Sequence, residues 1–229
     1  MIAAVCHINT DRDYGDSALR VLADDVMRPF LLQRLIVQHI LKTVCDHDGW
    51  KGFREDTDDE LDEIEKGLAA VDSSKPHERQ ILIDRRAKVI KHILADDKID
   101  AFSTFKKTEC HKALKSIIGP FLVKDPNNPG EAAHEAHRNL FLIVSDARDL
   151  SAKMLSSGLT FQHEWPHVGL RFFAAAYEPV NSVRGRLELE REGCRIKFAA
   201  TPSVTLRDDR GMAIKTTNLL QPGVLVTRG

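Results

Sequence analysis

The apolar spacing of the chain changes near Gly158, and this change constrains the fold more than any other feature. Before Gly158, long stretches place apolar residues three and four positions apart, which is typical of amphipathic helices. After it, short stretches alternate between apolar and polar residues, which favours strands. The sequence therefore predicts an α+β fold, mostly α, with a bundle of about six helices followed by a small antiparallel β-meander.

Two helices are expected to form the centre of the bundle. Residues 30–44 are apolar over a face too wide for a surface helix. Residues 129–158 combine an Asn cap, a proline and an acid at the start with a glycine at the end, which predicts one long helix. The other predicted helices cover residues 18–27, a segment starting at a capping box formed by Thr57 and Glu60, a segment opened by Pro76, and residues 100–118, which an αL cap at Gly119 should end.

Residues 187–190 and 194–198 are predicted to pair as a hairpin. If the numbers of facing residues sum to 385, Leu187 faces Phe198 and Glu188 faces Lys197, so that one face is apolar and the other is charge-complementary. A second hairpin is expected from residues 204–206 and 212–214, and a last strand over 224–226. The predicted organisation is an N-terminal strand or loop over residues 1–16, a helical body over 17–158, and a β-rich region over 159–229 that packs on it as one structural unit.

Charge is segregated along the chain although the formal net charge is only -1. Residues 1–72 hold 8 Lys+Arg against 16 Asp+Glu, whereas residues 73–124 hold 12 against 6. The acidic block 55–65 and the basic helix 79–91 either face each other as neighbouring helices or form a bipolar surface that docks a partner. On the second interpretation, the partner-binding residues are Arg79, Arg85, Arg86, Lys88, Lys91, Asp58, Asp59 and Asp62.

Histidine and cysteine residues are the candidates for chemistry. Glu131 and His134 share a helical face, as a di-iron site requires, but the sequence has no second Glu-x-x-His motif. His134 and His137 are three apart, which is not the spacing of a His-Glu-x-x-His zinc site. No metal site and no cofactor are therefore predicted. The alternative is a metal-dependent or Cys/His hydrolase whose site is assembled from distant residues, with candidates Cys45, His47, Cys110, His111, His163 and His167.

Several function classes lose support because their motifs are missing. The sequence has no G-x-S-x-G elbow, no G-x-x-x-x-G-K-[ST] loop, no G-x-G-x-x-G opening a helix and no kinase signature. No apolar run approaches the roughly 20 residues that cross a bilayer, so no membrane partner is expected. The first residues lack the basic region of a secretory signal, and the four cysteines are widely spaced, which favours free thiols and an intracellular location, cytoplasmic or nuclear.

Nucleic-acid binding through the basic helix 79–91 is a further alternative. Phosphate groups attract clustered Lys and Arg side chains, but this stretch has no aromatic residue that could stack on bases. The favoured prediction is a non-catalytic protein-interaction or regulatory module. It would belong to a larger intracellular protein or to a self-associating domain, and its partner would be another protein chain or itself.

One segment carries a resemblance. It consists of NLFLIVSDARDLSAKM over residues 139–154, then Ser-Gly-Leu-Thr-Phe161, Trp165 and Gly169-Leu-Arg-Phe172. This segment, 139–172, resembles one found near the C-termini of uncharacterised filamentous-fungal proteins. The resemblance implies a helical module of a longer intracellular protein, and it assigns no activity and no site residue.

Overall fold

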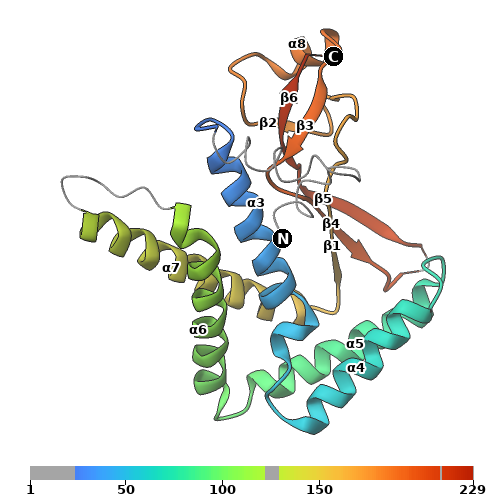
Figure 1. The fold of residues 1–229 in the computed structure, drawn as a ribbon. Helices are drawn as coiled ribbons and strands as arrows, with labels where there is room; N and C mark the ends of the chain where they lie inside the picture. Colours follow the sequence, from blue (N-terminus) through green and yellow to red (C-terminus); the bar gives the residue numbers. More distant parts are fainter. Residues whose placement is uncertain (1–23, 122–128, 212, 229) are drawn as a thin grey trace, which may run out of the picture. The chain divides into compact units, whose positions relative to one another are not determined.

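The computed structural model describes residues 24–121, 129–211 and 213–228 (Figure 1). The described residues form six α-helices and six strands, and the predicted class, α+β and mostly α, is confirmed. The helices are α3 (Arg28–Ile40), α4 (Glu55–Ala70), α5 (Pro76–Leu94), α6 (Ile99–Ile118), α7 (Pro129–Ser156) and α8 (Arg186–Arg191). The strands are β1 (Thr160–Glu164), β2 (Glu178–Pro179), β3 (Arg195–Ala199), β4 (Ser203–Asp208), β5 (Lys215–Leu220) and β6 (Gly223–Thr227).

Contacts within the chain divide it into two compact units. The helical unit consists of residues 38–160 and 207–215, and the mixed unit of residues up to 37, 161–206 and 216–229. The chain therefore leaves and re-enters each unit, and neither unit is one continuous segment. The predicted packing of the β-rich region on the helical body stays a prediction.

The helical unit is built around one apolar cluster to which every one of its long helices contributes. Helices α4 and α5 lie side by side and run in opposite directions, while α6 and α5 both contact α7 (Figure 1). A π-helical turn (η1, Leu41–Cys45) and a 3-10 turn (η2, His47–Trp50) precede α4. The cluster contains Trp50, Leu61, Ile64, Val89, Ile90, Ile93, Phe102 and Leu155.

No helix among the described residues combines the length and the apolar character that crossing a bilayer requires. The predicted core helix 30–44 is present as α3 and η1, in which Leu31, Leu35, Ile40 and Val44 are buried. The helices predicted from Pro76, over 100–118 and over 129–158 are likewise confirmed as α5, α6 and α7. Of the predicted helix 18–27, residues 24–27 form a turn before α3 and not a helix, while the rest of it and the N-terminal segment 1–16 lie outside the described residues.

The mixed unit holds two three-stranded sheets. Their strand orders are β1-β4-β5 and β2-β6-β3, with β2 parallel and β3 antiparallel to β6. Strands that neighbour each other in a sheet are mostly distant in sequence, so the connections are more complex than those of a meander. The core of this unit contains Phe172, Leu189, Cys194, Ile196, Ala199, Val224 and Val226.

The predicted hairpin of residues 187–198 is wrong. Residues 186–191 form helix α8, in which Leu189 is buried and Leu187 is exposed. Strand β3 instead pairs with β6, with Ile196 opposite Val226. The predicted last strand is confirmed as β6, and it gives β3 an apolar partner that a charged strand 187–190 could not match. The Leu-Glu alternation of residues 187–190 fits a strand, but it also fits one turn of helix with a single buried residue. The long-range pairing of β3 with β6 decides between strand and helix.

Two predicted helix ends also differ from the structure. Helix α4 begins at Glu55, so Thr57 lies inside the first turn, where its hydroxyl donates to the carbonyl of Arg54 (2.8 Å) instead of capping the helix. Acidic side chains in that turn complement the helix dipole without a capping box. Gly119 has right-handed φ and ψ values of -50° and -43°, and the chain continues into a 3-10 turn, so the αL cap is wrong.

The second hairpin is present with a shifted strand. Strands β4 and β5 are neighbours in one sheet, and the hydroxyl of Thr205 donates to Asn218 across them (3.2 Å). Strand β5 begins at Lys215, whereas the prediction placed this strand over residues 212–214. Met212 itself lies outside the described residues.

Candidate functional site

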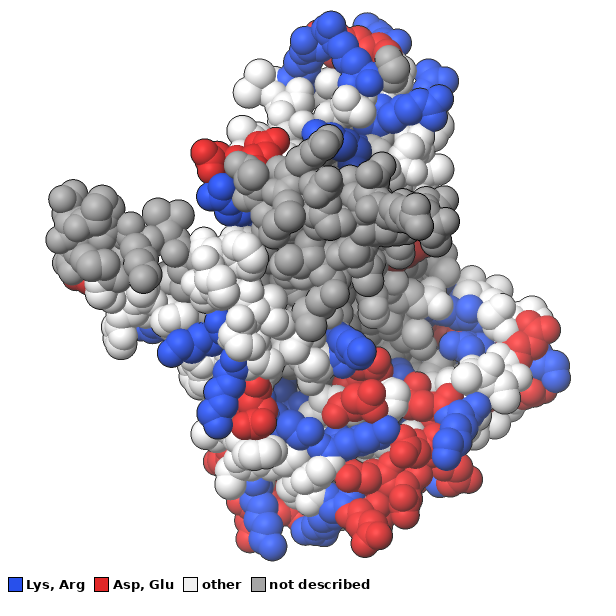
Figure 2. Space-filling view, viewed as in Figure 1, with Lys and Arg blue, Asp and Glu red and all other residues white. Residues whose placement is uncertain are grey.

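The acidic block and the basic helix, which were predicted to dock a partner, contact each other in α4 and α5. Arg85 donates to Glu60 (2.8 Å) and to Glu63 (2.9 Å), and Arg86 donates to Glu65 (3.0 Å). Figure 2 shows acidic and basic side chains interspersed over this part of the surface. Pairing of neighbouring helices, the first of the two interpretations, therefore accounts for both arginines.

The other basic side chains of the predicted surface have different surroundings. Arg79 donates to the carbonyl of Leu68 (3.2 Å), and its Nε lies 3.7 Å from the buried carboxylate of Asp209. Lys88 and Lys91 are exposed, and neither forms an ion pair with a described residue. Of the five predicted basic residues, these two are thus the ones left to meet an outside partner or a phosphate backbone.

The predicted acidic residues are also partly engaged within the helical unit. Both carboxylate oxygens of Asp58 accept from the N–H of Gly52 (2.9 and 2.8 Å). Asp62 pairs with Lys51, and this hydrogen bond lowers the pKa of the Asp62 carboxyl. Asp59 is exposed. The predicted acidic patch is therefore tied to the loop that precedes α4.

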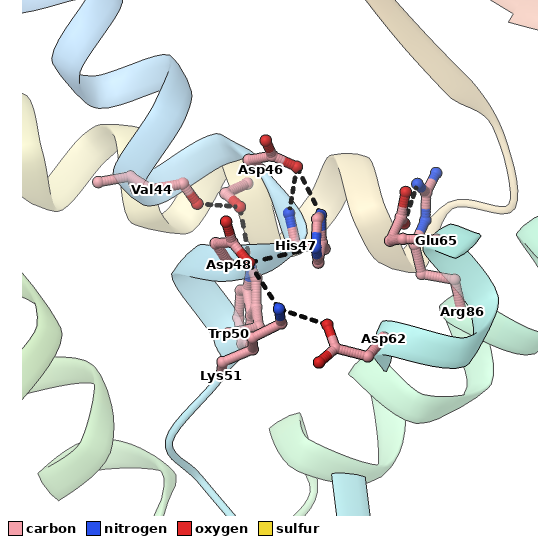
Figure 3. Close-up of polar contacts among 10 residues, drawn as sticks. Val44, Asp46, His47, Asp48, Trp50, Lys51, Asp62, Glu65 and Arg86 are labelled. Carbon is pink, nitrogen blue, oxygen red and sulfur yellow. Dashed lines mark hydrogen bonds and ion pairs between the residues drawn. The ribbon is translucent and has the colours of Figure 1, made fainter. Parts of the chain in front are cut away.

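His47 is the centre of a charged cluster at the start of η2 (Figure 3). Its Nδ1 lies 2.8 Å from Asp46 Oδ1 and its Nε2 lies 3.2 Å from Asp48 Oδ1. The ammonium of Lys51 shares the Asp48 carboxylate (2.8 Å). The hydrogen bond to Asp46 and the charges of Glu65, Asp46 and Asp48 raise the pKa of His47, although burial opposes them. The folded protein therefore favours an imidazolium at this position.

We expect this cluster to make stability depend on pH. A folded pKa above the unfolded value of 6.5 stabilises the protein fully below that pH, and the contribution is lost as pH rises through the folded pKa. A His47→Gln variant should therefore lose more unfolding free energy at pH 6 than at pH 9, measured by urea unfolding. The control is His134→Gln, at an exposed position, which should change the unfolding free energy only slightly at pH 6 and at pH 9. A loss from His47→Gln that is equal at pH 6 and pH 9 would contradict the prediction.

Within the described residues, no cysteine of the helical unit forms a hydrogen bond with a histidine. The Sγ of Cys110 lies 3.5 Å from the hydroxyl of Thr43, and His111 Nε2 donates to the carbonyl of His137 (3.1 Å). Burial raises the pKa of the Cys45 thiol to about 11, and it also raises that of Cys110. Thiols with raised pKa values are poor nucleophiles, so these residues add no support for a Cys/His hydrolase.

The remaining candidates for metal binding or catalysis are exposed. Glu131 and His134 lie in the first two turns of α7, while His163 and His167 belong to the mixed unit. Across residues 24–121, 129–211 and 213–228, no group of three or more His, Cys, Asp and Glu side chains is arranged to hold a metal ion. The described cysteines, Cys45, Cys110 and Cys194, are free thiols.

The helical unit contains a buried polar network that was not predicted from the sequence. Trp50 Nε1 donates to Ser151 Oγ (3.0 Å), whose hydroxyl donates to the carbonyl of Val44 (2.7 Å), as Figure 3 shows in part. The guanidinium of Arg148 stacks 3.6 Å from the centre of the Trp50 ring and donates to the carbonyl of Gly49 (2.6 Å). The sequence offers one signal for this network, because Arg148 and Ser151 interrupt an otherwise apolar stripe of the long helix.

Among the described strands, none pairs with the outer edge of β5 in the mixed unit. Strand β5 is the last strand in the order β1-β4-β5 (Figure 1), and all six of its residues are exposed. Leu219 and Leu220 each expose 51% of their surface. The outer edge of β3 is covered instead, because Gly169 donates to the carbonyl of Ile196 and Ile196 donates to that of Leu170 (2.8 Å each).

Comparison of the chain with protein-family models, with curated proteins and with solved structures gives no match. The resemblance of residues 139–172 to fungal C-terminal segments stays a prediction. The function must therefore be inferred from the side chains and edges described above.

Proposed function

We propose that this chain is a non-catalytic protein-interaction module that associates with a second copy of itself through strand β5. The observation that carries the proposal is that no strand within the described residues pairs with the outer edge of β5 and that β5 buries none of its six residues. Such an edge presents unpaired N–H and C=O groups, which another strand can satisfy. Lys215 is its single charged residue, so little on the strand blocks such pairing.

The packing around β5 supports a partner. A strand normally buries one face against its own chain, but β5 exposes Leu219 and Leu220, which as neighbours in a strand point to opposite faces. The same unit covers the edge of β3 with residues 169–172, so the open edge of β5 is not a general property of its sheets. Addition of another strand would bury backbone and apolar surface that β5 now leaves in water.

The charge pattern of β5 favours a second copy as that partner. In an antiparallel pair of identical strands, the two Lys215 side chains lie at opposite ends and do not repel each other. If Asn218 faces its own counterpart, Thr216 faces Leu220 and Thr217 faces Leu219, and no charged residue is placed opposite another. The predicted partner-binding arginines, Arg85 and Arg86, take no part in this arrangement because they pair with acids of α4.

Sedimentation velocity over a range of concentrations tests this proposal. We expect the unaltered chain to dimerise and Thr217→Lys to weaken dimerisation at least about tenfold, because like charges across an interface are costly. Gln162→Lys adds the same charge to β1, the opposite edge strand, and should leave dimerisation unchanged. An equimolar mixture of Thr217→Lys and Thr217→Glu should associate better than either alone. A strict monomer at high concentration, or equal effects of the two lysines, would overturn the proposal.

A further inference from the structure

We propose that a pocket of the helical unit binds a phosphate-bearing small molecule. The pocket has a volume of about 320 Å³ and lies between the end of α3, the turn η1 and helix α6. Its lining includes His39, Lys42 and Lys106 together with Asp48 and Glu109. All of these residues belong to residues 38–160, so the site is contained in one unit.

The two lysines of this pocket form no ion pair with a described carboxylate, whereas its two carboxylates each pair with a lysine. Asp48 is paired with Lys51 (2.8 Å), and Glu109 with Lys112 (3.3 Å). Lys42 and Lys106 form no ion pair with any residue that the structure describes. Two lysine charges are therefore available to a ligand, and each of the two acids has a lysine partner that does not line the pocket.

Arg148 does not line the pocket, but it carries a further buried positive charge whose field acts on Lys106. Only 3% of the surface of Arg148 is exposed, and Nη1 donates to the carbonyl of Gly49, whereas Nε and Nη2 have no hydrogen-bond partner in the part of the chain that the structure describes. Arg148 and Lys106 both lie over the ring of Phe102, at 5.3 and 5.6 Å from its centre. A buried guanidinium without a carboxylate is costly, and a nearby anion would offset that cost.

The ionisation of the pocket residues agrees with an excess of positive charge. Burial, and then the charge of Arg148, lower the pKa of Lys106, although the charges of Asp58, Asp48 and Glu109 oppose them. Burial, and then the charge of Lys42, lower the pKa of His39, whose buried Nε2 has no hydrogen-bond partner among the described residues. Burial lowers the pKa of Arg148 to about 10. An anion in the pocket would favour the charged form of each of these groups.

The number of cations and the size of the pocket indicate the class of ligand. The two lysines that line the pocket, Lys42 and Lys106, match a phosphate dianion better than a carboxylate, which carries one charge. The volume exceeds that of inorganic phosphate and falls in the range of small-molecule sites. A phosphate monoester would place its phosphate near the lysines and its organic part in the remaining space.

Nuclear magnetic resonance of the histidine rings tests this inference on the full chain. At constant ionic strength, inorganic phosphate and phenyl phosphate should shift the His39 signals saturably and raise the pKa of His39, whereas chloride should not. Tighter binding of phenyl phosphate would identify a monoester site, and equal binding would restrict the inference to phosphate itself and overturn the monoester assignment. His39 signals that respond to phosphate no more than to chloride would overturn the whole inference.

Matched lysine variants locate the site. Lys106→Met keeps the apolar stem and should weaken phosphate binding about tenfold, the loss of one charge-assisted hydrogen bond. Lys115→Met removes the same charge from an exposed position of α6 and should change binding less than twofold. Lys42→Met should reproduce the effect of Lys106→Met, and it replaces that variant if circular dichroism shows that Lys106→Met is unfolded. Equal binding by the pocket variants and Lys115→Met would place the ligand elsewhere and reject this site.

Discussion

A Trp50→Ala variant is expected to lose about 3–5 kcal/mol of unfolding free energy. The Trp50 ring is 1% exposed, and it packs in the central cluster of the helical unit. Its removal leaves a cavity, deprives Ser151 of its donor and takes away the surface on which Arg148 is stacked. A buried guanidinium without its aromatic neighbour is poorly solvated, so cavity and charge effects add. Urea unfolding followed by far-ultraviolet circular dichroism measures the loss.

A Trp50→Phe variant separates the ring from its polar contact. Phenylalanine keeps most of the apolar surface and the face under Arg148 but cannot donate to Ser151, so we expect a loss of about 1–2 kcal/mol. Replacing the exposed Phe105 by alanine in the same unit should cost much less than Trp50→Ala. Equal stability of Trp50→Ala and the unaltered chain would show that this network does not form.

The second large effect is expected from Arg86→Glu, at about 3 kcal/mol of unfolding free energy. Arg86 is buried in α5, and its Nη1 donates to Glu65 of α4, whose side chain is also largely buried. The substitution places two carboxylates in this position with no cation between them. Because these carboxylates repel each other, the contact between α4 and α5 is weakened, and the urea midpoint of equilibrium unfolding should fall.

Lys88→Glu makes the same change of charge on the exposed face of α5 and should alter stability by less than about 0.5 kcal/mol. Exchange of the pair, Glu65→Arg with Arg86→Glu, should recover part of the loss. If Lys88→Glu were as damaging as Arg86→Glu, net charge and not this ion pair would control the stability of the helix pair.

The parts of the fold that the sequence predicts correctly are those coded locally. Helix α7 has its proline near the first turn, its glycine after the last turn and its apolar stripe all within 30 residues of sequence. The failed hairpin is of the opposite kind, because the partner of β3 lies in β6, which begins 24 residues after β3 ends. The local alternation at residues 187–190 could not show that a more apolar strand, β6, follows later in the sequence and pairs with β3.

The candidate site residues likewise divide into those that local sequence predicts and those that depend on long-range contacts. Charge segregation correctly drew attention to residues 55–65 and 79–91, but counting charges cannot tell whether opposite blocks meet within one chain or across two. The contacts of Arg85 and Arg86 are made across 21 to 25 residues of sequence, and those of Trp50 with Ser151 across 101. The edge of β5 carries no sequence signal of its own, since it is defined by which of the described strands pair with β5.

The division of each unit into separate stretches of sequence has a consequence for the newly made protein. The carboxylate of Asp209 is buried in the helical unit, where it accepts from Arg207 (2.8 and 3.0 Å) and lies near Arg79, and Arg207 donates to the carbonyl of Ser73 (2.5 Å). While the ribosome is still adding residues 161–206, the helices are already synthesised but these contacts do not exist. The helical unit therefore cannot complete its native contacts until residues 207–209 have emerged, and strand β6, which the mixed unit needs, is synthesised within about 20 residues after them.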